Sequence, residues 1–129
     1  SIGLNISLPM EQEPNPYITP GLSFNFHYFF MRKLWFAHMA KALIVFPGGY
    51  GTLDEMMEIL TLSQTNKFHK KMLVMIYGSE YWHKVISFDA MEELGTIDPS
   101  DRKLFKFAND PQQAYYLLTT WLEKNYPLE

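Results

Sequence analysis

The segment best suited to chemistry is FPGGYGTLDE, residues 46–55. It places Gly48, Gly49 and Gly51 close together and follows them with two carboxylates. One turn seldom needs three glycines, whereas a site where the backbone must approach a ligand closely can use them all. An apolar run precedes the segment and a helical pattern follows it, so its amides are expected at a helix N-terminus, where anions bind. We therefore predict that this turn binds a phosphate group.

The spacing of these glycines excludes two common nucleotide-binding motifs. No lysine follows Gly51, as a Walker-type phosphate loop requires, and the glycines do not follow the GxGxxG pattern of dinucleotide-binding folds. A nucleoside triphosphate and a dinucleotide are therefore poor candidates as ligands. A ligand with one phosphate group fits the segment better.

A purely structural interpretation of the same residues stays open at this point. Residues 52–55 have the T-x-x-E pattern of a capping box, with Thr52 as N-cap and Glu55 at the third helical position. Glycines between a strand and a helix also serve chain geometry alone. The sequence thus allows both a phosphate site and a capped helix after a permissive turn.

Predicted strands and helices alternate along the chain, and they determine where this segment lies in the fold. Apolar, β-prone runs predict four strands, at 2–8, 42–46, 72–77 and 104–107, and the aromatic run at 24–30 is a candidate for a further short buried strand. Helices are predicted at 31–41, from 52 to about 67, from 80 to about 94, and from Pro111 to about 125 after an Asp110 N-cap. Residues 10–22 are expected to form an extended loop and 95–101 a turn.

This alternation predicts an α/β fold, with right-handed βαβ units on a Rossmann-like parallel sheet with flanking helices. The whole chain, residues 1–129, is expected to be a single nucleotide-binding domain. Only about four strands are expected, no helix precedes the first, and the chain starts at Ser1 without a methionine. We therefore expect a fragment, the C-terminal portion of a larger doubly wound domain.

Composition narrows the class of protein. A content of 47% hydrophobic and 16% aromatic residues indicates a globular chain. The formal net charge of −3 argues against a nucleic-acid partner. No run approaches the roughly 20 apolar residues of a membrane span, which argues against a membrane partner. The absence of cysteine excludes disulfides and thiolate metal sites and fits a cytoplasmic location.

Other residue types that often carry chemistry lack the required pattern. The four histidines have neither metal-ligand spacing nor an HExxH motif, so no metal site is expected: His27, His38, His69 and His83. No serine stands in a nucleophile elbow. The glycine segment therefore stays the main candidate.

Two motifs together resemble those of the LOG family, whose members were once labelled lysine-decarboxylase-like. Residues 47–55 match the family's PGGxGTxxE signature, and Arg32-Lys33, 15 residues before Pro47, matches its Arg-Lys pair. Residues 8–33 (LPMEQEPNPYITPGLSFNFHYFFMRK) also resemble the bacterial branch of the family. The resemblance covers essentially the whole chain.

The resemblance implies an enzyme, a nucleoside 5′-monophosphate phosphoribohydrolase that releases the free base from AMP or from a cytokinin riboside 5′-monophosphate. It implies no cofactor, and because the residues show no pyridoxal phosphate site, lysine decarboxylation is not expected. Family members are usually dimers, so a homodimer or higher homo-oligomer is expected. They also carry a further N-terminal half, in agreement with the expectation of a fragment.

For this reaction, the phosphate and the ribose need different groups. The 5′-phosphate would be held through backbone amides and the helix dipole by Gly48, Gly49, Gly51 and Thr52, with Tyr50 beside the substrate. Glu55, one helical turn further on, would stabilise the oxocarbenium-like ribose or activate water. Arg32 would polarise the leaving base or orient Glu55, and Lys33 would add positive charge near the substrate.

Further candidates have plain structural alternatives. Glu58 shares the face of Glu55 and is expected to support the site, although a solvated glutamate explains it equally well. Glu11 and Asn15 resemble family residues near the substrate, while the polarity of their loop alone would explain both. The aromatic run at 24–36 is interpreted as core, with a dimer surface as the alternative.

Two other functions stay open on the sequence alone. The first is a non-catalytic nucleotide or cofactor carrier, since a glycine turn binds phosphate whether or not chemistry follows. The second is an interaction module that persists by dimerising. Arg32 and Glu55 favour the enzyme, because a carrier needs neither residue at these positions.

Overall fold

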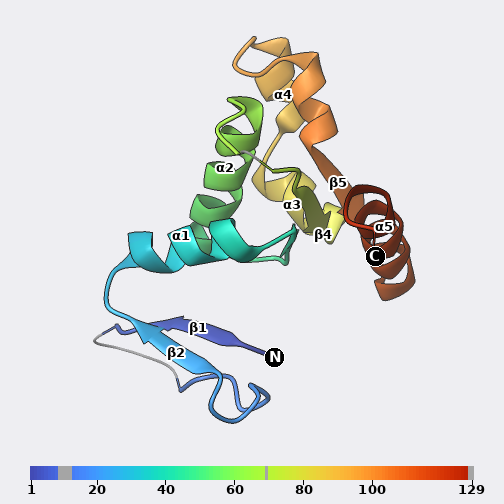
Figure 1. Cartoon of the computed structure of the whole chain (residues 1–129). Helices are drawn as coiled ribbons and strands as arrows, with labels where there is room; N and C mark the ends of the chain where they lie inside the picture. Colours follow the sequence, from blue (N-terminus) through green and yellow to red (C-terminus); the bar gives the residue numbers. More distant parts are fainter. Residues whose placement is uncertain (9–12, 69, 128–129) are drawn as a thin grey trace. The chain divides into compact units, whose positions relative to one another are not determined.

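The computed structural model describes residues 1–8, 13–68 and 70–127, and the chain forms two compact units, Ser1–Met39 and Ala40–Glu129. Each unit combines parallel strands with helices (Figure 1), which confirms the predicted α/β, Rossmann-like class. None of the helices within these described ranges is long and apolar enough to cross a bilayer.

The first unit pairs two short parallel strands and follows them with a helix. β1 (Gly3–Ile6) lies beside β2 (Ser23–Phe26), in a register that runs from Gly3 opposite Ser23 to Ile6 opposite Phe26. α1 spans Phe29–Met39. Gly3 is buried, and an added Cβ would overlap the side chain of Ile18. The side chain of Ile18 therefore packs on β1 at a position that has no side chain of its own.

The short strand predicted at 24–30 is present as β2, but its predicted end and its predicted burial are wrong. β2 ends at Phe26 and is mostly exposed, and α1 begins at Phe29 and ends at Met39, two residues before the predicted limits at each end. No residue within α1 is buried. The interpretation of the run 24–36 as core is wrong too, because these side chains are exposed: Phe24, Tyr28, Phe29, Phe30, Trp35 and Phe36. Aromatic content indicates strand propensity but does not settle burial.

The second unit is built on a three-stranded parallel sheet with the strand order β3–β4–β5. β3 spans Ala42–Val45, the central β4 spans Leu73–Tyr77, and β5 spans Phe105–Ala108. The connections carry α2 (Tyr50–Gln64), α3 (Ser79–Val85), α4 (Phe88–Glu93) and the short 3-10 helix η1 (Pro99–Leu104), and α5 (Pro111–Asn125) follows β5. The predicted strands at 42–46, 72–77 and 104–107 are thus confirmed to within a residue at each end.

Both faces of this sheet are covered, which explains why β4 is apolar at successive positions. Leu73 and Met75 pack with Ala108 beneath α5, which contributes Leu117 and Trp121 among other side chains. The intervening β4 side chains, at 74 and 76, point to the opposite face and are fully buried. On that face the rings of Phe88, from α4, and Phe105 lie 4.6 Å apart.

The single helix predicted from 80 to about 94 is two helices. α3 ends at Val85, Ile86 is extended, and α4 starts after Ser87, whose hydroxyl accepts a hydrogen bond from the amide of Ala90 at 3.1 Å. The serine acts as an N-cap and therefore restarts the helix. The predicted turn at 95–101 runs into η1, which begins with a capping box at Asp98.

The last helix forms as predicted. The Asp110 carboxylate accepts a hydrogen bond from the amide of Gln113 at 2.8 Å, Pro111 occupies the first turn, and α5 ends at Asn125. Proline fits here because the first amides of a helix have no partner within it. Local capping signals were therefore sufficient to place this element.

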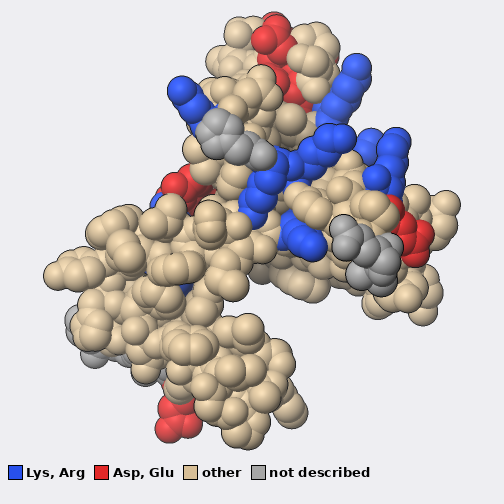
Figure 2. All heavy atoms as spheres, in the orientation of Figure 1, with Lys and Arg blue, Asp and Glu red and all other residues tan. Residues whose placement is uncertain are grey.

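Lysines surround the last strand of the sheet. Within the described residues β5 pairs with β4 alone, so its other edge is unpaired. Lys103, Lys106 and Lys124 border a groove of about 250 Å³ whose lining includes Leu117 and Trp121. Figure 2 shows Lys and Arg side chains gathered on the visible face of this unit. Charges along an edge strand discourage its pairing with another sheet.

Candidate functional site

The glycine turn lies at the carboxyl edge of the three-stranded sheet. Val45, at the end of β3, pairs with Ile76, and Tyr77, at the end of β4, pairs with Ala108. The three chain segments that leave these parallel strands therefore start side by side. In open α/β sheets this edge is the usual place for a ligand.

Hydrogen bonds tie the ends of β4 and β5 together at this edge. The amide of Gly78 donates to the carbonyl of Ala108 at 2.8 Å. The side-chain oxygen of Asn109 accepts from both the amide and the hydroxyl of Ser79, each at 2.8 Å. The start of α3 is thereby fixed to the strand that precedes α5.

The start of α3 in turn holds the glycine turn. The hydroxyl of Tyr81 donates to the carbonyl of Gly48 at 2.9 Å. Gly78 has a φ of +84°, a conformation that favours glycine, and an added Cβ there would lie 3.4 Å from Cγ of Pro47. Sequence reasoning missed Gly78 and Tyr81, although a glycine directly after a buried strand is a signal that marks this edge.

The capping-box interpretation of residues 52–55 is wrong. α2 begins at Tyr50, with Gly49 as N-cap and no side-chain hydrogen bond at the cap. The amide of Leu53 donates to the carbonyl of Gly49 at 3.0 Å, which is the first bond of the helix. Thr52 is thus the third helical residue and Glu55 the sixth, too far along to reach the cap. The backbone amides that precede Leu53 have no acceptor within the helix, so they can donate to an acceptor outside it.

The three glycines of the turn have different structural requirements. None has a positive φ, since the positive-φ glycines are Gly21, Gly78 and Gly95. At Gly48, an added Cβ would overlap the side chain of Thr52. At Gly49 and at Gly51, an added Cβ would meet no atom within 4 Å. Packing therefore requires glycine at position 48, whereas at 49 and 51 the described neighbours leave room for a side chain.

The other predicted residues on α2 line up along its outer side. Met56 and Ile59 are buried, which fixes the orientation of the helix. Glu55 is partly exposed and Glu58 is exposed, so both carboxylates can reach a ligand in solvent. Tyr50 is 93% exposed, so its ring is available to a ligand rather than used in the core.

The predicted Arg-Lys pair belongs to the first unit. Arg32 and Lys33 are partly buried residues of α1. The guanidinium of Arg32 donates to the carbonyl of Leu4 at 3.5 Å and lies 5.5 Å from the centre of the Phe36 ring. Arg32 is therefore held against β1 and its own helix, while the glycine turn and Glu55 belong to the second unit.

The remaining loop candidates are local. The side-chain oxygen of Asn15 accepts from the amide of Tyr17 at 2.9 Å, a turn-forming bond that explains the asparagine without a ligand. Glu11 lies outside the described residues, as does His69. Across the described ranges, no group of three or more His, Asp or Glu side chains could hold a metal ion.

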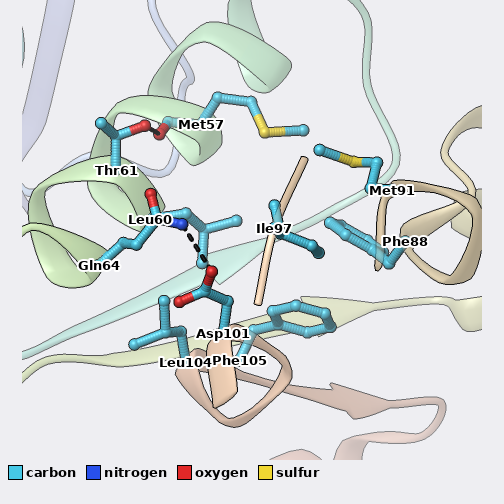
Figure 3. A pocket seen from close by; sticks show the side chains of 10 residues that line it. All are labelled: Met57, Leu60, Thr61, Gln64, Phe88, Met91, Ile97, Asp101, Leu104 and Phe105. Atoms are coloured by element: carbon cyan, nitrogen blue, oxygen red, sulfur yellow. Dashed lines mark hydrogen bonds between the residues drawn. The ribbon is translucent and has the colours of Figure 1, made fainter. Parts of the chain in front are cut away.

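A small apolar pocket lies away from the glycine turn, along the later part of α2 (Figure 3). It has a volume of about 100 Å³ and is lined by α2, α4, η1 and the start of β5. Gln64 donates to the carboxylate of Asp101 at 2.6 Å at its border. The pocket contains none of the predicted site residues and is a gap between packed helices.

One perturbed group lies at the opposite, amino edge of the sheet. The ammonium of Lys70 donates to the carbonyl of Ala40 at 2.5 Å, just before β3. Burial lowers the pKa of Lys70 from its ordinary value. Because Lys70 precedes β4, it is remote from the glycine turn and links two strand beginnings instead.

Comparison with known proteins places this geometry in a family context. A family model described as possible lysine decarboxylase matches residues 1–118. The chain is similar to the probable cytokinin riboside 5′-monophosphate phosphoribohydrolase LOGL3 of Oryza sativa subsp. japonica, with 37% identity over 84 residues, 64% of this chain and 39% of that protein.

Two further relatives come from Arabidopsis thaliana. The cytokinin riboside 5′-monophosphate phosphoribohydrolase LOG7 is 32% identical over 64% of this chain and 38% of its own length. LOG1, which carries the same description, is 30% identical over 73% of this chain and 44% of its own length. The chain thus spans about two fifths of the length of these curated relatives. All three are plant proteins, so the resemblance to a bacterial branch stays a prediction.

We predict opposite effects on stability for alanine at two glycines of the turn. Gly48→Ala should lower the free energy of unfolding by about 1–3 kcal/mol, because its methyl group overlaps Thr52. Gly51→Ala should leave it unchanged or raise it by up to about 1 kcal/mol, because alanine favours a helix and the added Cβ meets nothing. Denaturant unfolding measures both values. Equal losses in the two variants would contradict the difference in packing.

Proposed function

The chain belongs to the family described as possible lysine decarboxylase, the LOG family, and we propose that it hydrolyses the N-glycosidic bond of a nucleoside 5′-monophosphate. The observation that carries the proposal is the open space at Gly49 and Gly51, at the start of a helix and at the ligand-binding edge of a parallel sheet. No described neighbour requires a glycine at either position, and close approach of a ligand supplies a reason for both.

The 5′-phosphate is the part of the substrate that this turn binds. The amides of Gly49, Tyr50, Gly51 and Thr52 precede the first bond of α2, and the positive end of the helix dipole lies at the same place. A Cβ at Gly49 or Gly51 would occupy the space through which the phosphate oxygens approach these amides. A single phosphate satisfies several donors at once, which suits a nucleoside monophosphate.

Glu55 is the catalytic carboxylate. Hydrolysis adds water at C1′ as the bond to the base nitrogen breaks, and the base takes up a proton, so the products are the free base and ribose 5-phosphate. Positive charge builds up on the ribose in the transition state. Glu55 lies three residues beyond Thr52 on the outer side of α2, where its negative charge can stabilise that ribose or activate the water.

Arg32 and Lys33 supply the positive groups of the reaction. Arg32 polarises the leaving base or orients Glu55, and Lys33 adds charge near the substrate. Both are partly buried, and one guanidinium nitrogen of Arg32 donates to the carbonyl of Leu4. Glu58, exposed one turn beyond Glu55, supports the same site.

The substrate is AMP or a cytokinin riboside 5′-monophosphate. The names of the plant relatives specify the second of these. Decarboxylation of lysine is not proposed, because those relatives are named as phosphoribohydrolases and the glycine turn suits a phosphate rather than an amino acid. A carrier that binds the nucleotide without cleaving it is the alternative, and the products distinguish the two.

A second copy of the chain is the proposed partner. The exposed aromatic side chains of α1 include Phe29, Phe30, Trp35 and Phe36, and at least 41% of each is accessible. Large apolar side chains exposed together on one helix are typical of an interface. A homodimer or higher homo-oligomer would remove these rings from water.

The reaction itself is tested by chromatography of nucleotides incubated with the protein. We expect AMP to yield adenine and ribose 5-phosphate, and adenosine to be a far poorer substrate because it lacks the anchored phosphate. Gly51→Ala, which keeps or gains stability, should weaken AMP binding and leave adenosine unaffected. Equal turnover of AMP and adenosine would remove the phosphate from the mechanism, and binding of AMP without products would make the protein a carrier.

Glu55→Gln should lower kcat for AMP by about 10² or more while the melting temperature and the affinity for AMP stay nearly constant. The substitution keeps the shape and removes the negative charge, and a residue six positions into α2 has no capping role to lose. Arg32→Ala should also lose activity. Glu93→Gln, an exposed glutamate on α4, is the matched control and should retain full activity. Lost stability with preserved activity per folded molecule would refute the catalytic role of Glu55.

Sedimentation of the chain should show a dimer or a larger assembly at micromolar concentration. Replacing Phe30 and Trp35 together by glutamate should shift it to a monomer, because both rings are exposed on α1. Tyr115→Glu, at a side chain 71% exposed on α5, should leave the assembly unchanged. A wild-type chain that is monomeric at these concentrations would contradict the proposed partner.

A further inference from the structure

The carbonyl of Gly48 and the amide of Gly49 belong to one peptide unit. No peptide bond in the described chain is cis, so the carbonyl oxygen and the amide hydrogen of this unit point in opposite directions. The carbonyl accepts the hydroxyl of Tyr81 at 2.9 Å. The direction of the Gly49 amide is therefore set by a side chain from α3, on the next strand-to-helix connection.

A peptide between two glycines turns over easily without such a restraint. Gly48 and Gly49 both lack a Cβ, so the two torsions that flank the peptide have few steric barriers. After a half-turn, the carbonyl oxygen would occupy the direction of the amide and present negative charge to an approaching phosphate. The overlap of an added Cβ at Gly48 with Thr52 constrains residue identity but does not set the direction of the peptide.

We propose that Tyr81 is a positioning residue, whose hydroxyl holds the Gly48–Gly49 peptide so that the Gly49 amide faces the 5′-phosphate. This inference rests on the proposed function, because it assigns the orientation of a donor in the same phosphate site. Tyr81 touches the turn rather than the substrate, so it acts on binding of the phosphate and not on the bond that breaks.

Tyr81 is itself held firmly enough to act in this way. Its amide donates to the carbonyl of Gly78 at 3.1 Å, at the start of α3. Its ring lies edge-on to Trp82, with 5.1 Å between ring centres. Trp82 is fully buried, and its indole donates to the carbonyl of Tyr77 at 3.0 Å. The hydroxyl therefore reaches Gly48 from a fixed ring on a packed helix.

The test compares Tyr81→Phe with Tyr115→Phe, which removes a hydroxyl from an exposed ring on α5. Calorimetric titration with AMP should show about 3- to 10-fold weaker binding for Tyr81→Phe, the effect of one neutral hydrogen bond, and wild-type affinity for Tyr115→Phe. KM for AMP should rise by the same factor while kcat stays within about twofold. Turnover of adenosine, which carries no phosphate, should not change.

Nuclear magnetic resonance spectroscopy measures phosphate binding at the turn without depending on enzymatic activity. In the wild-type protein, the amide resonance of Gly49 should shift on titration with ribose 5-phosphate, and in Tyr81→Phe the shift should require a correspondingly higher concentration. Unchanged affinity in Tyr81→Phe overturns the proposal. So does a combined loss of melting temperature, kcat and adenosine turnover, because that pattern describes a residue needed only for folding.

Failure of the proposed reaction has a different signature. A wild-type protein that binds AMP but releases no adenine contradicts the hydrolase, while the comparison of affinities still decides the role of Tyr81. A wild-type protein in which neither AMP nor ribose 5-phosphate shifts the Gly49 resonance removes the phosphate site and the proposal with it.

Discussion

The parallel pairing of β3, β4 and β5 is the constraint on which the rest of the second unit depends. It brings three strand ends to one edge, although the residues that meet there are far apart in sequence: Tyr81 and Gly48 are 33 positions apart, and Ser79 and Asn109 are 30. The strands can align in this way because α5 covers one face of the sheet and α4 the other. Each contact at the edge is a consequence of that burial.

The first turn of α2 contains a glycine that makes the helix less stable and that packing does not require. A glycine inside a helix is less favourable than alanine by roughly 0.5–1 kcal/mol, and Gly51 is the second residue of α2. At the N-cap, by contrast, glycine is an accepted residue, and serine or aspartate in place of Gly49 would be better by only about a few tenths of a kcal/mol. Proteins tend to break such local rules at functional sites. Gly51 therefore supports the proposed site independently of the resemblance of the chain to any family.

Sequence alone predicted the elements whose signals are local. The buried runs of β3 and β4 and the Asp110-Pro111 start of α5 were placed within about a residue, because burial on both faces and capping leave direct traces in composition. The T-x-x-E pattern at Thr52 failed because α2 already starts at Tyr50, with Gly49 as its N-cap, so no cap is needed at Thr52. The division between α3 and α4 was missed because a capping serine inside a helical pattern looks like any polar residue.

Asn109 has a consequence for how quickly a ligand can be captured. Its side-chain oxygen accepts two hydrogen bonds from Ser79, and its backbone amide donates to the side-chain oxygen of Gln113 at 2.8 Å. These bonds connect the start of α3 to the start of α5, so the two helix starts move as one body. Donors held on such a frame need no loop closure before they engage an anion, and little ordering entropy is lost when they do. If the proposed phosphate site forms here, differences in affinity between variants of this edge should therefore appear mainly in the dissociation rate.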